Sequence, residues 1–192
     1  MTGLQQRFLE DVLRNPCNRA LLEGLPEMGL ADAWLVGGCL FQTVWNLLSD
    51  RLPQAGIRDY DIFYFDPDDL SETTEQAVEE RARARFAELG IVLEVKNQAR
   101  VHTWYEAYFG RPCPPLRSAC EGVDRFLVGS TSVAVHREAG AMVLHAPYGL
   151  DDLYSGVLTP NPTVDHGPLY ERKSRDYQAR WAWLRTPETF KS

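Results

Sequence analysis

A pair of glycines, Gly37-Gly38, separates two apolar stretches of the chain, residues 33–36 and residues 39–49. The first stretch is typical of a short buried strand, and the second is typical of a helix. Residues without a Cβ allow a tight turn and the close approach of a ligand, while the unpaired N–H groups at a helix start favour an anion. The sequence therefore predicts a strand, a glycine turn and a helix that begins beside an anionic ligand.

Two aspartates, Asp59 and Asp61, open the next apolar stretch, residues 62–65. Residues two apart on a strand point to the same face, so both carboxylates are expected on one side. Crowded carboxylates repel each other, and a hard divalent cation such as Mg²⁺ relieves that repulsion. Taken singly, a Gly-Gly is most often a turn and an Asp-x-Asp a solvated strand end, but their order along this chain favours a functional site.

A third carboxylate, Glu94, lies within residues 91–96, which read as another strand after a long helix at 71–89. If this strand pairs beside the Asp-x-Asp strand, three carboxylates converge, enough to hold two cations about 3.5–4 Å apart for phosphoryl transfer. An exposed acid alternating with Leu93 and Val95 on a half-buried strand explains Glu94 equally well.

The remaining pattern predicts an α/β (α+β) domain, a mixed sheet flanked by helices with a C-terminal hairpin and helix. Thr2 and Gln5 form a capping box, Asn15-Pro16 starts a second helix, and Asn97 is expected to cap a helix at 98–108. Further helices are expected at 118–126 and 168–184, a hairpin at 130–136 and 141–146, and a helix capped by Asp151. We expect one domain over 1–192, with a core at about 30–110 and an acceptor-side elaboration at about 111–192.

With these motifs the chain resembles the polymerase-beta-like nucleotidyltransferase superfamily. That superfamily is marked by a Gly-Gly at a helix start, an Asp-x-Asp strand and a third acid on a neighbouring strand. The matching positions here are Gly37, Gly38, Asp59, Asp61 and Glu94. A closer likeness, to a bacterial family of nucleotidyltransferase-like proteins, is carried by residues 59–66, 95–102 and 146–153.

The resemblance implies transfer of a nucleoside monophosphate from a nucleoside triphosphate to a hydroxyl acceptor, with release of pyrophosphate. It implies Mg²⁺ or Mn²⁺, two ions in number, and it assigns catalysis and metal binding to Asp59, Asp61 and Glu94. Nucleotide contacts are then expected from the glycine turn and the nearest cations: Gly37, Gly38, Cys39, Arg58, Lys96 and Arg100.

Two departures from the superfamily pattern support alternatives. Cys39 replaces the usual serine, and a thiol is a weak hydrogen-bond donor. The 21 positions from Gly38 to Asp59 exceed the usual spacing. A catalytically weak nucleotide-binding or protein-partner module therefore stays open, as does a structural domain in which the acids are solvated strand ends.

The composition limits the classes of partner that we expect this protein to bind. Twenty basic against twenty-seven acidic residues give a net charge of −7, which argues against a broad nucleic-acid-binding surface. No apolar run approaches the roughly 18 residues that span a membrane, and the first residues lack the form of a secretory signal. The four cysteines are scattered, so we expect reduced thiols and a cytoplasmic protein.

Overall fold

The computed structural model describes residues 2–110, 112–164 and 167–187. Its strands are β1 (Trp34–Val36), β2 (Tyr60–Tyr64), β3 (Leu93–Asn97), β4 (Ala134–Glu138) and β5 (Ala141–His145). Its α-helices are α1 (Gly3–Leu13), α2 (Pro16–Gly24), α3 (Gly38–Leu47), α4 (Glu72–Arg85), α5 (Val101–Phe109), α6 (Ala119–Val123), α7 (Asp151–Ser155) and α8 (Gly167–Arg180). Short 3₁₀ turns are η1 (Leu25–Met28), η2 (Ala87–Leu89), η3 (Gln98–Arg100) and η4 (Gly129–Thr131).

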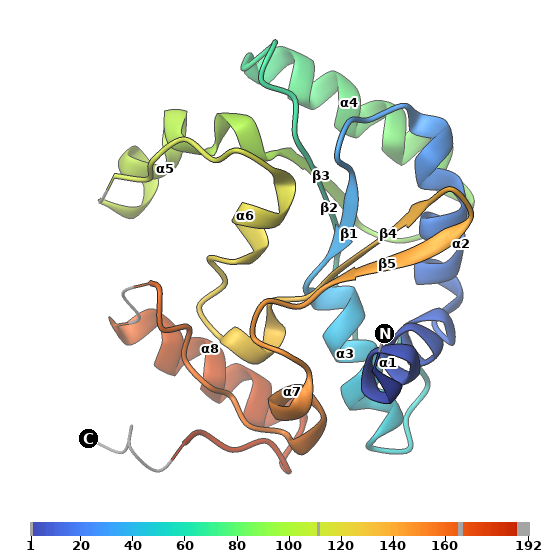
Figure 1. Ribbon diagram of the computed structural model, residues 1–192, viewed down its shortest axis with the longest axis vertical. Helices are drawn as coiled ribbons and strands as arrows, with labels where there is room; N and C mark the ends of the chain where they lie inside the picture. The colour runs from blue at the N-terminus through green and yellow to red at the C-terminus, as the bar shows by residue number, and fades with distance from the viewer. Residues whose placement is uncertain (1, 111, 165–166, 188–192) are drawn as a thin grey trace.

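One mixed sheet of five strands, in the order β3-β2-β1-β4-β5, forms the centre of the molecule (Figure 1). β2 and β3 pair in parallel, while β1 is antiparallel to both of its neighbours and β4 is antiparallel to β5. Parallel neighbours need a crossover connection, and α4 supplies it. This pairing sets Asp61 directly opposite Glu94.

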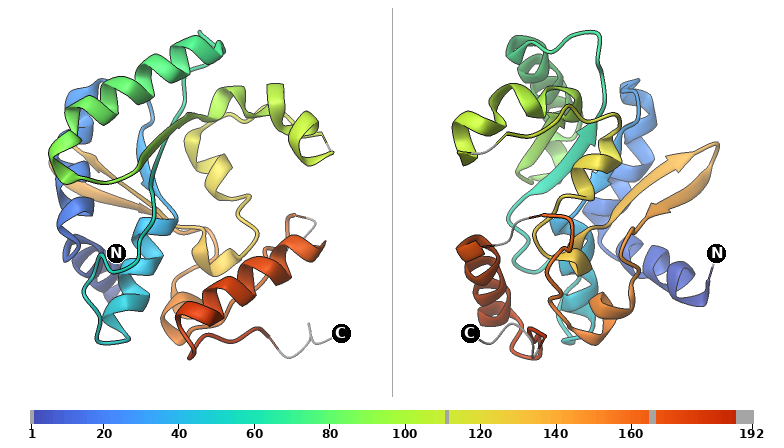
Figure 2. Two further views of the ribbon diagram at one scale, coloured as in Figure 1. Left: turned by 180° about the vertical axis from the view of Figure 1, so that it is seen from behind. Right: turned by 60° about the vertical axis from the view of Figure 1, so that its left-hand side comes forward.

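The two faces of the sheet carry different cores. Leu35, Ile62 and Val95 point to the face covered by α1, α2 and α3, where the larger hydrophobic cluster lies. Trp34 and Val36 point to the other face and pack against α6 in a smaller cluster. The second face carries α5 and α6 (Figure 2), while α8 packs beside α3 through Tyr177. The expected mixed sheet, flanking helices, C-terminal hairpin and helix are confirmed.

The edge of β3 is covered by side chains of α4 in place of a further strand. The backbone N–H groups of Val95 and Asn97 donate to Glu79 (3.0 Å) and Glu75 (2.8 Å), one helical turn apart. Arg83, another turn along α4, donates to the carbonyl of Leu93 at 2.9 Å. Side chains four residues apart on α4 thus reach backbone groups two residues apart on β3. They satisfy the hydrogen-bonding groups at this edge in place of a partner strand.

Several element boundaries differ from those that the sequence predicts. The hairpin begins at Ala134, because residues 129–131 form the buried turn η4. Asn97 caps η3 before α5 begins, and α8 ends at Arg180. Asp151 does not cap α7: Leu150 occupies that position without a side-chain bond, so this expectation is wrong. Within the described ranges, no helix is both long and apolar enough to cross a bilayer.

Candidate active site

Three carboxylates share the sheet face that carries the smaller core. Asp59 immediately precedes β2, Asp61 lies two residues on, and Glu94 is the register partner of Asp61 on β3. Burial first, and then the negative charges of Asp59 and Glu94, raise the pKa of Asp61 to about 7. Asp61 is therefore close enough to both other acids for their charges to act on it.

The glycine turn and the start of α3 adjoin these acids. Gly37 has a φ of +60° and precedes α3 without a side-chain cap, so the N–H groups of the first residues, Gly38 and Cys39, have no helical partner. A Cβ on Gly38 would lie 3.8 Å from an Asp59 oxygen. The Cys39 side chain is fully buried, and its thiol donates to the Val36 carbonyl at 3.7 Å. Cys39 therefore offers a ligand its backbone, while its thiol faces the core.

We expect Gly37→Ala to destabilise the protein more than Gly90→Ala. Both glycines have a φ near +60°, which costs an L-residue roughly 1–2 kcal/mol, but a Cβ on Gly37 would also meet the Phe126 ring at 2.7 Å. A Cβ on Gly90 would meet nothing within 4 Å. Urea unfolding of both variants measures the difference, and equal losses would contradict a tight fit of the glycine turn against Phe126.

Helix α8 lines the other side of the acids. Tyr177 packs its ring against Phe41 and Trp45, and Trp181 donates from its indole nitrogen to Asn46 at 3.1 Å. These contacts fix α8 along α3. A cleft of about 440 Å³ lies beside this contact, lined by Gln42, Arg58, Asp59, Lys173, Asp176, Tyr177, Ala179 and Arg180.

The cleft gathers positive charge around Asp59. Arg180 donates to Gln42 (2.6 Å) and to the Gly56 carbonyl (2.7 Å), and burial together with nearby Arg58 lowers its pKa. Desolvation also lowers the pKa of Lys173, against the opposing charges of Asp61 and Asp59. Within the described ranges, the side chains of Lys173 and the three acids have no hydrogen-bond or ion-pair partner. Charges of both signs that lack a direct partner, gathered in and beside one cleft, are typical of a ligand site.

The long spacing between Gly38 and Asp59 is taken up by an ordered loop. Asn46 donates to the carbonyls of Pro53 and Ala55 at 3.0 and 2.9 Å, and Arg180 holds Gly56. Because loop length costs little entropy, the extra residues do not disturb the relation between the glycine turn and the acids.

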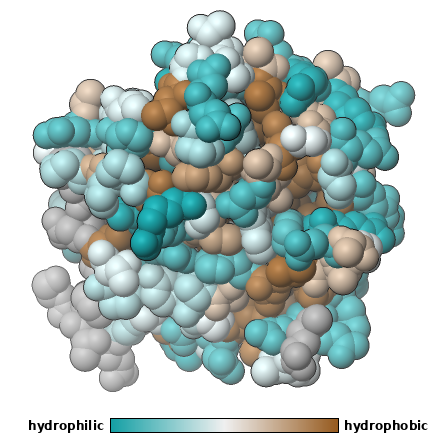
Figure 3. Space-filling view, turned by 45° about the horizontal axis from the view of Figure 1, so that its top comes forward, coloured by the Kyte–Doolittle hydropathy of each residue, from teal (hydrophilic) through white to brown (hydrophobic). Residues whose placement is uncertain are grey.

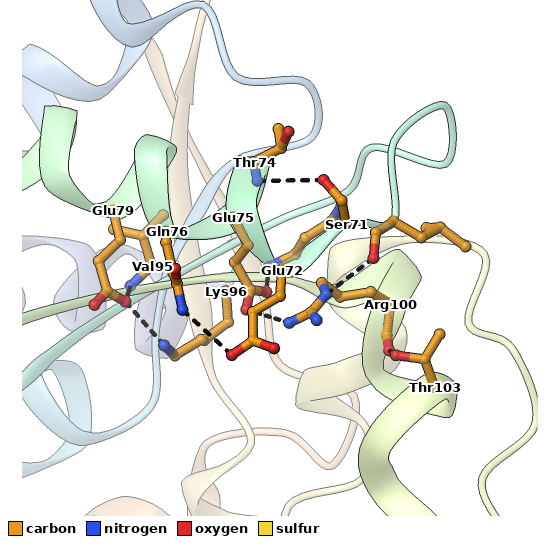
Figure 4. Close-up of polar contacts among 12 residues, drawn as sticks. Ser71, Glu72, Thr74, Glu75, Gln76, Glu79, Val95, Lys96, Arg100 and Thr103 are labelled. Carbon is orange, nitrogen blue, oxygen red and sulfur yellow. Dashed lines mark hydrogen bonds and ion pairs between the residues drawn. The ribbon is translucent and has the colours of Figure 1, made fainter.

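The two other predicted cations lie in different places (Figure 4). Lys96 pairs with Glu79 at 2.9 Å, yet its charge still lowers the pKa of Asp61, so it borders the site. Arg100 is buried and pairs with Glu75 at 2.6 Å while donating to the Leu70 carbonyl. Arg100 therefore stabilises the connection from α4 to β3 and does not join the acids, contrary to the nucleotide contact expected from the sequence.

The donor chemistry of the three acids fits a hard divalent cation, since all three offer carboxylate oxygens with no competing partner. They do not form a ready-made cage: among residues 2–110, 112–164 and 167–187, no group of three or more His, Cys, Asp or Glu side chains converges to hold a metal ion. The set is therefore chemically suited to Mg²⁺ or Mn²⁺ without being assembled around one.

The raised pKa of Asp61 predicts a pH dependence of stability in metal-free buffer. Its folded-state pKa, about 7, lies above the ordinary 3.8, so the protonated form favours folding. This contribution is complete below about pH 4 and is lost as the pH rises towards 7, by at most about 1.4 kcal/mol per pH unit. Urea unfolding of wild type and Asp61→Asn between pH 4.5 and 8 measures it, and parallel profiles would contradict the shift.

Comparison with known proteins identifies the family of this chain. The model of a nucleotidyltransferase family matches residues 23–186. The chain belongs to this family. A solved structure, described as an NMR structure that reveals a CCA-adding enzyme head domain, aligns with this nucleotidyltransferase at a TM-score of 0.78 and 28% identity over 95% of each chain. A search of the curated proteins finds no match.

Sequence reasoning missed the contribution of α8 to this nucleotidyltransferase. Lys173, Asp176, Tyr177 and Arg180 follow one helix face at spacings of three, four and seven residues. In the sequence, these residues form a polar stripe along one helix face that is interrupted by one aromatic residue, Tyr177. No local pattern, however, places α8 beside a motif more than 100 residues earlier.

Proposed function

We propose that this nucleotidyltransferase moves a nucleoside monophosphate from a nucleoside triphosphate to a hydroxyl acceptor in a divalent-metal-dependent reaction. The observation that carries the proposal is the electrostatic coupling of Asp61 to Asp59 and Glu94, which together with burial raises its pKa to about 7, beside a Lys173 ammonium that has no ion-pair partner among the described residues. We propose that residues 1–192 act as one unit, because the cleft combines residues 42–59 with residues 173–180.

In the proposed reaction, the acceptor oxygen attacks the α-phosphorus and the bond to the β-bridging oxygen breaks, so that pyrophosphate leaves. Asp59, Asp61 and Glu94 would hold Mg²⁺ or Mn²⁺, which would supply charge stabilisation of the phosphoryl group. The N–H groups of Gly38 and Cys39 hydrogen-bond the phosphate oxygens. Lys173, Arg58 and Arg180 balance the negative charge of the triphosphate and of the leaving pyrophosphate. Glu94 accepts the proton from the acceptor hydroxyl.

The alternative is a nucleotide-binding module with weak catalysis on the same fold. It is favoured by one observation, namely that the three acids are not assembled into a ligand cage. Both proposals predict nucleotide binding, but they differ in the rate of catalytic turnover that they predict.

Two measurements test the proposal together. Thermal unfolding with each ribonucleoside triphosphate, with and without Mg²⁺ or Mn²⁺, is expected to show stabilisation that needs both components. Pyrophosphate release in the presence of hydroxyl compounds then reports turnover. Stabilisation without pyrophosphate release from any acceptor would favour the weak module, and the absence of metal-dependent stabilisation would contradict both.

Lys173→Met is expected to lower kcat/KM by roughly 10- to 100-fold, because a charged hydrogen bond to phosphate contributes about 1.5–3 kcal/mol. Stability should change little, since Lys173 has no partner among the described residues. The neighbouring Arg172→Met is the matched control, because Arg172 is exposed on α8 and lies outside the cleft lining. Equal activity of Lys173→Met and Arg172→Met would remove Lys173 from the site.

A further inference from the structure

An aromatic hollow of about 300 Å³ lies on the same sheet face as the three acids. Three of its rings come from α5, namely Trp104, Tyr105 and Phe109, and two come from β2 and the segment after α6, namely Phe63 and Phe126. Trp104 is 37% exposed and Phe109 41% exposed. Apolar side chains do reach the surface as patches between hydrophilic ones (Figure 3). An aromatic-lined hollow of this kind suits a flat ring.

Two residues of the hollow lie beside the acids on the same strands. Phe63 follows Asp61 by two residues on β2, and Lys96 follows Glu94 by two residues on β3, so each lies on the same face as its acid. Lys173 lines both the hollow and the polar cleft. Lys173 therefore connects the aromatic hollow with the polar cleft that Asp59 lines.

The polar groups that line the hollow indicate the chemical class of its ligand. Lys96, Arg125 and Lys173 line it, and its described lining residues include no Asp or Glu. Gln98 adds an amide whose nitrogen donates a long bond of 3.4 Å to the Lys96 carbonyl. The surroundings thus combine ring faces for stacking, cations for an attached anionic group and one amide for a polar ring edge. A nucleobase attached through its sugar to a phosphate has this chemistry.

We infer that the aromatic hollow binds the nucleobase of the nucleoside triphosphate, with the triphosphate extending across Lys173 into the cleft lined by Arg58 and Arg180. This inference rests on the proposed function. It assigns base stacking to α5, an element that carries none of the acids or glycines of the motif, and it makes binding depend on the base as well as on the phosphates.

Calorimetric titration with the four ribonucleoside triphosphates and with inorganic tripolyphosphate, all in MgCl₂ without an acceptor, tests the inference. Wild type should bind the best nucleotide more tightly than tripolyphosphate. Trp104→Ala should weaken nucleotide binding roughly 5- to 150-fold, the loss of one stacking partner, and leave tripolyphosphate binding unchanged. Tyr108→Ala is the matched control, since Tyr108 is a neighbouring ring on α5, 77% exposed, outside the hollow.

The outcomes separate the inference from the proposed function. Unchanged nucleotide binding by Trp104→Ala overturns the inference while the proposed function stands, and it leaves the hollow to the acceptor. A wild type that binds neither nucleotide nor tripolyphosphate overturns both. If Trp104→Ala does not fold, Phe109→Ala replaces it, because that ring lines the same hollow and is also exposed.

Discussion

Asp59→Asn/Asp61→Asn is expected to be more stable than wild type in metal-free buffer at pH 8 and to gain nothing from Mg²⁺ with a nucleoside triphosphate. Burial and two neighbouring carboxylates disfavour the charged form of Asp61, so a neutral amide removes that cost. We expect the free energy of unfolding to rise by about 1–2 kcal/mol, since the carboxylate keeps some contact with water. Nucleotidyl transfer should fall at least about 10³-fold, because the cation's oxygen ligands are lost.

Thermal unfolding in EDTA and in MgCl₂ with nucleotide gives both readouts. Asp66→Asn/Asp68→Asn is the matched control, because it changes two aspartates of the same spacing just after β2, where Asp66 accepts from the Asp68 backbone instead of facing another acid. A double variant at 59 and 61 that is still stabilised by metal and nucleotide would contradict the site. If the double variant is more stable than wild type and wild type itself is not stabilised by metal, the purely structural interpretation of the acids would be favoured.

Glu75→Ala is expected to lower the free energy of unfolding by about 3–5 kcal/mol. Glu75 is 8% exposed, pairs with buried Arg100 at 2.6 Å and accepts the Asn97 N–H at 2.8 Å. Its loss leaves a buried guanidinium without its carboxylate and a backbone donor of β3 unsatisfied. Urea denaturation followed by circular dichroism measures the loss, which should be close to the largest of any single substitution outside the apolar core.

Glu72→Ala controls for the helix itself, since Glu72 lies in the same first turn of α4 and its side chain hydrogen-bonds only to Gln76 among the described residues. It should change stability by no more than about 0.5 kcal/mol. Glu75→Leu/Arg100→Leu should recover part of the loss of Glu75→Ala, because no charge is then left buried alone. Equal effects of Glu72→Ala and Glu75→Ala would show that α4 does not support the edge of β3.

Local chemistry explains which elements the sequence predicts well. Thr2 and Gln5 form the expected capping box, Asn15 caps α2, and Ser71 caps α4. The alternation around Asp61 and Glu94 follows directly from the two-residue period of a strand. Each of these features depends on residues within a few positions of one another. Element boundaries differ from the predicted ones where a residue distant in sequence makes a contact. At η4, for example, Gly129 donates to the Thr159 carbonyl at 2.7 Å.

Contacts distant along the chain determined the rest. Arg100 has the charge expected of a phosphate ligand, but Glu75, 25 residues earlier, holds it on another side of β3. Lys173 carries no motif, yet the packing of Tyr177 and Trp181 against α3 brings it to the acids. The sequence by itself determined the acids, the glycine turn and the face on which the acids lie, because strand and helix periods are local. Only the tertiary structure decided which cations meet those acids, because that depends on how helices distant in sequence pack on the sheet.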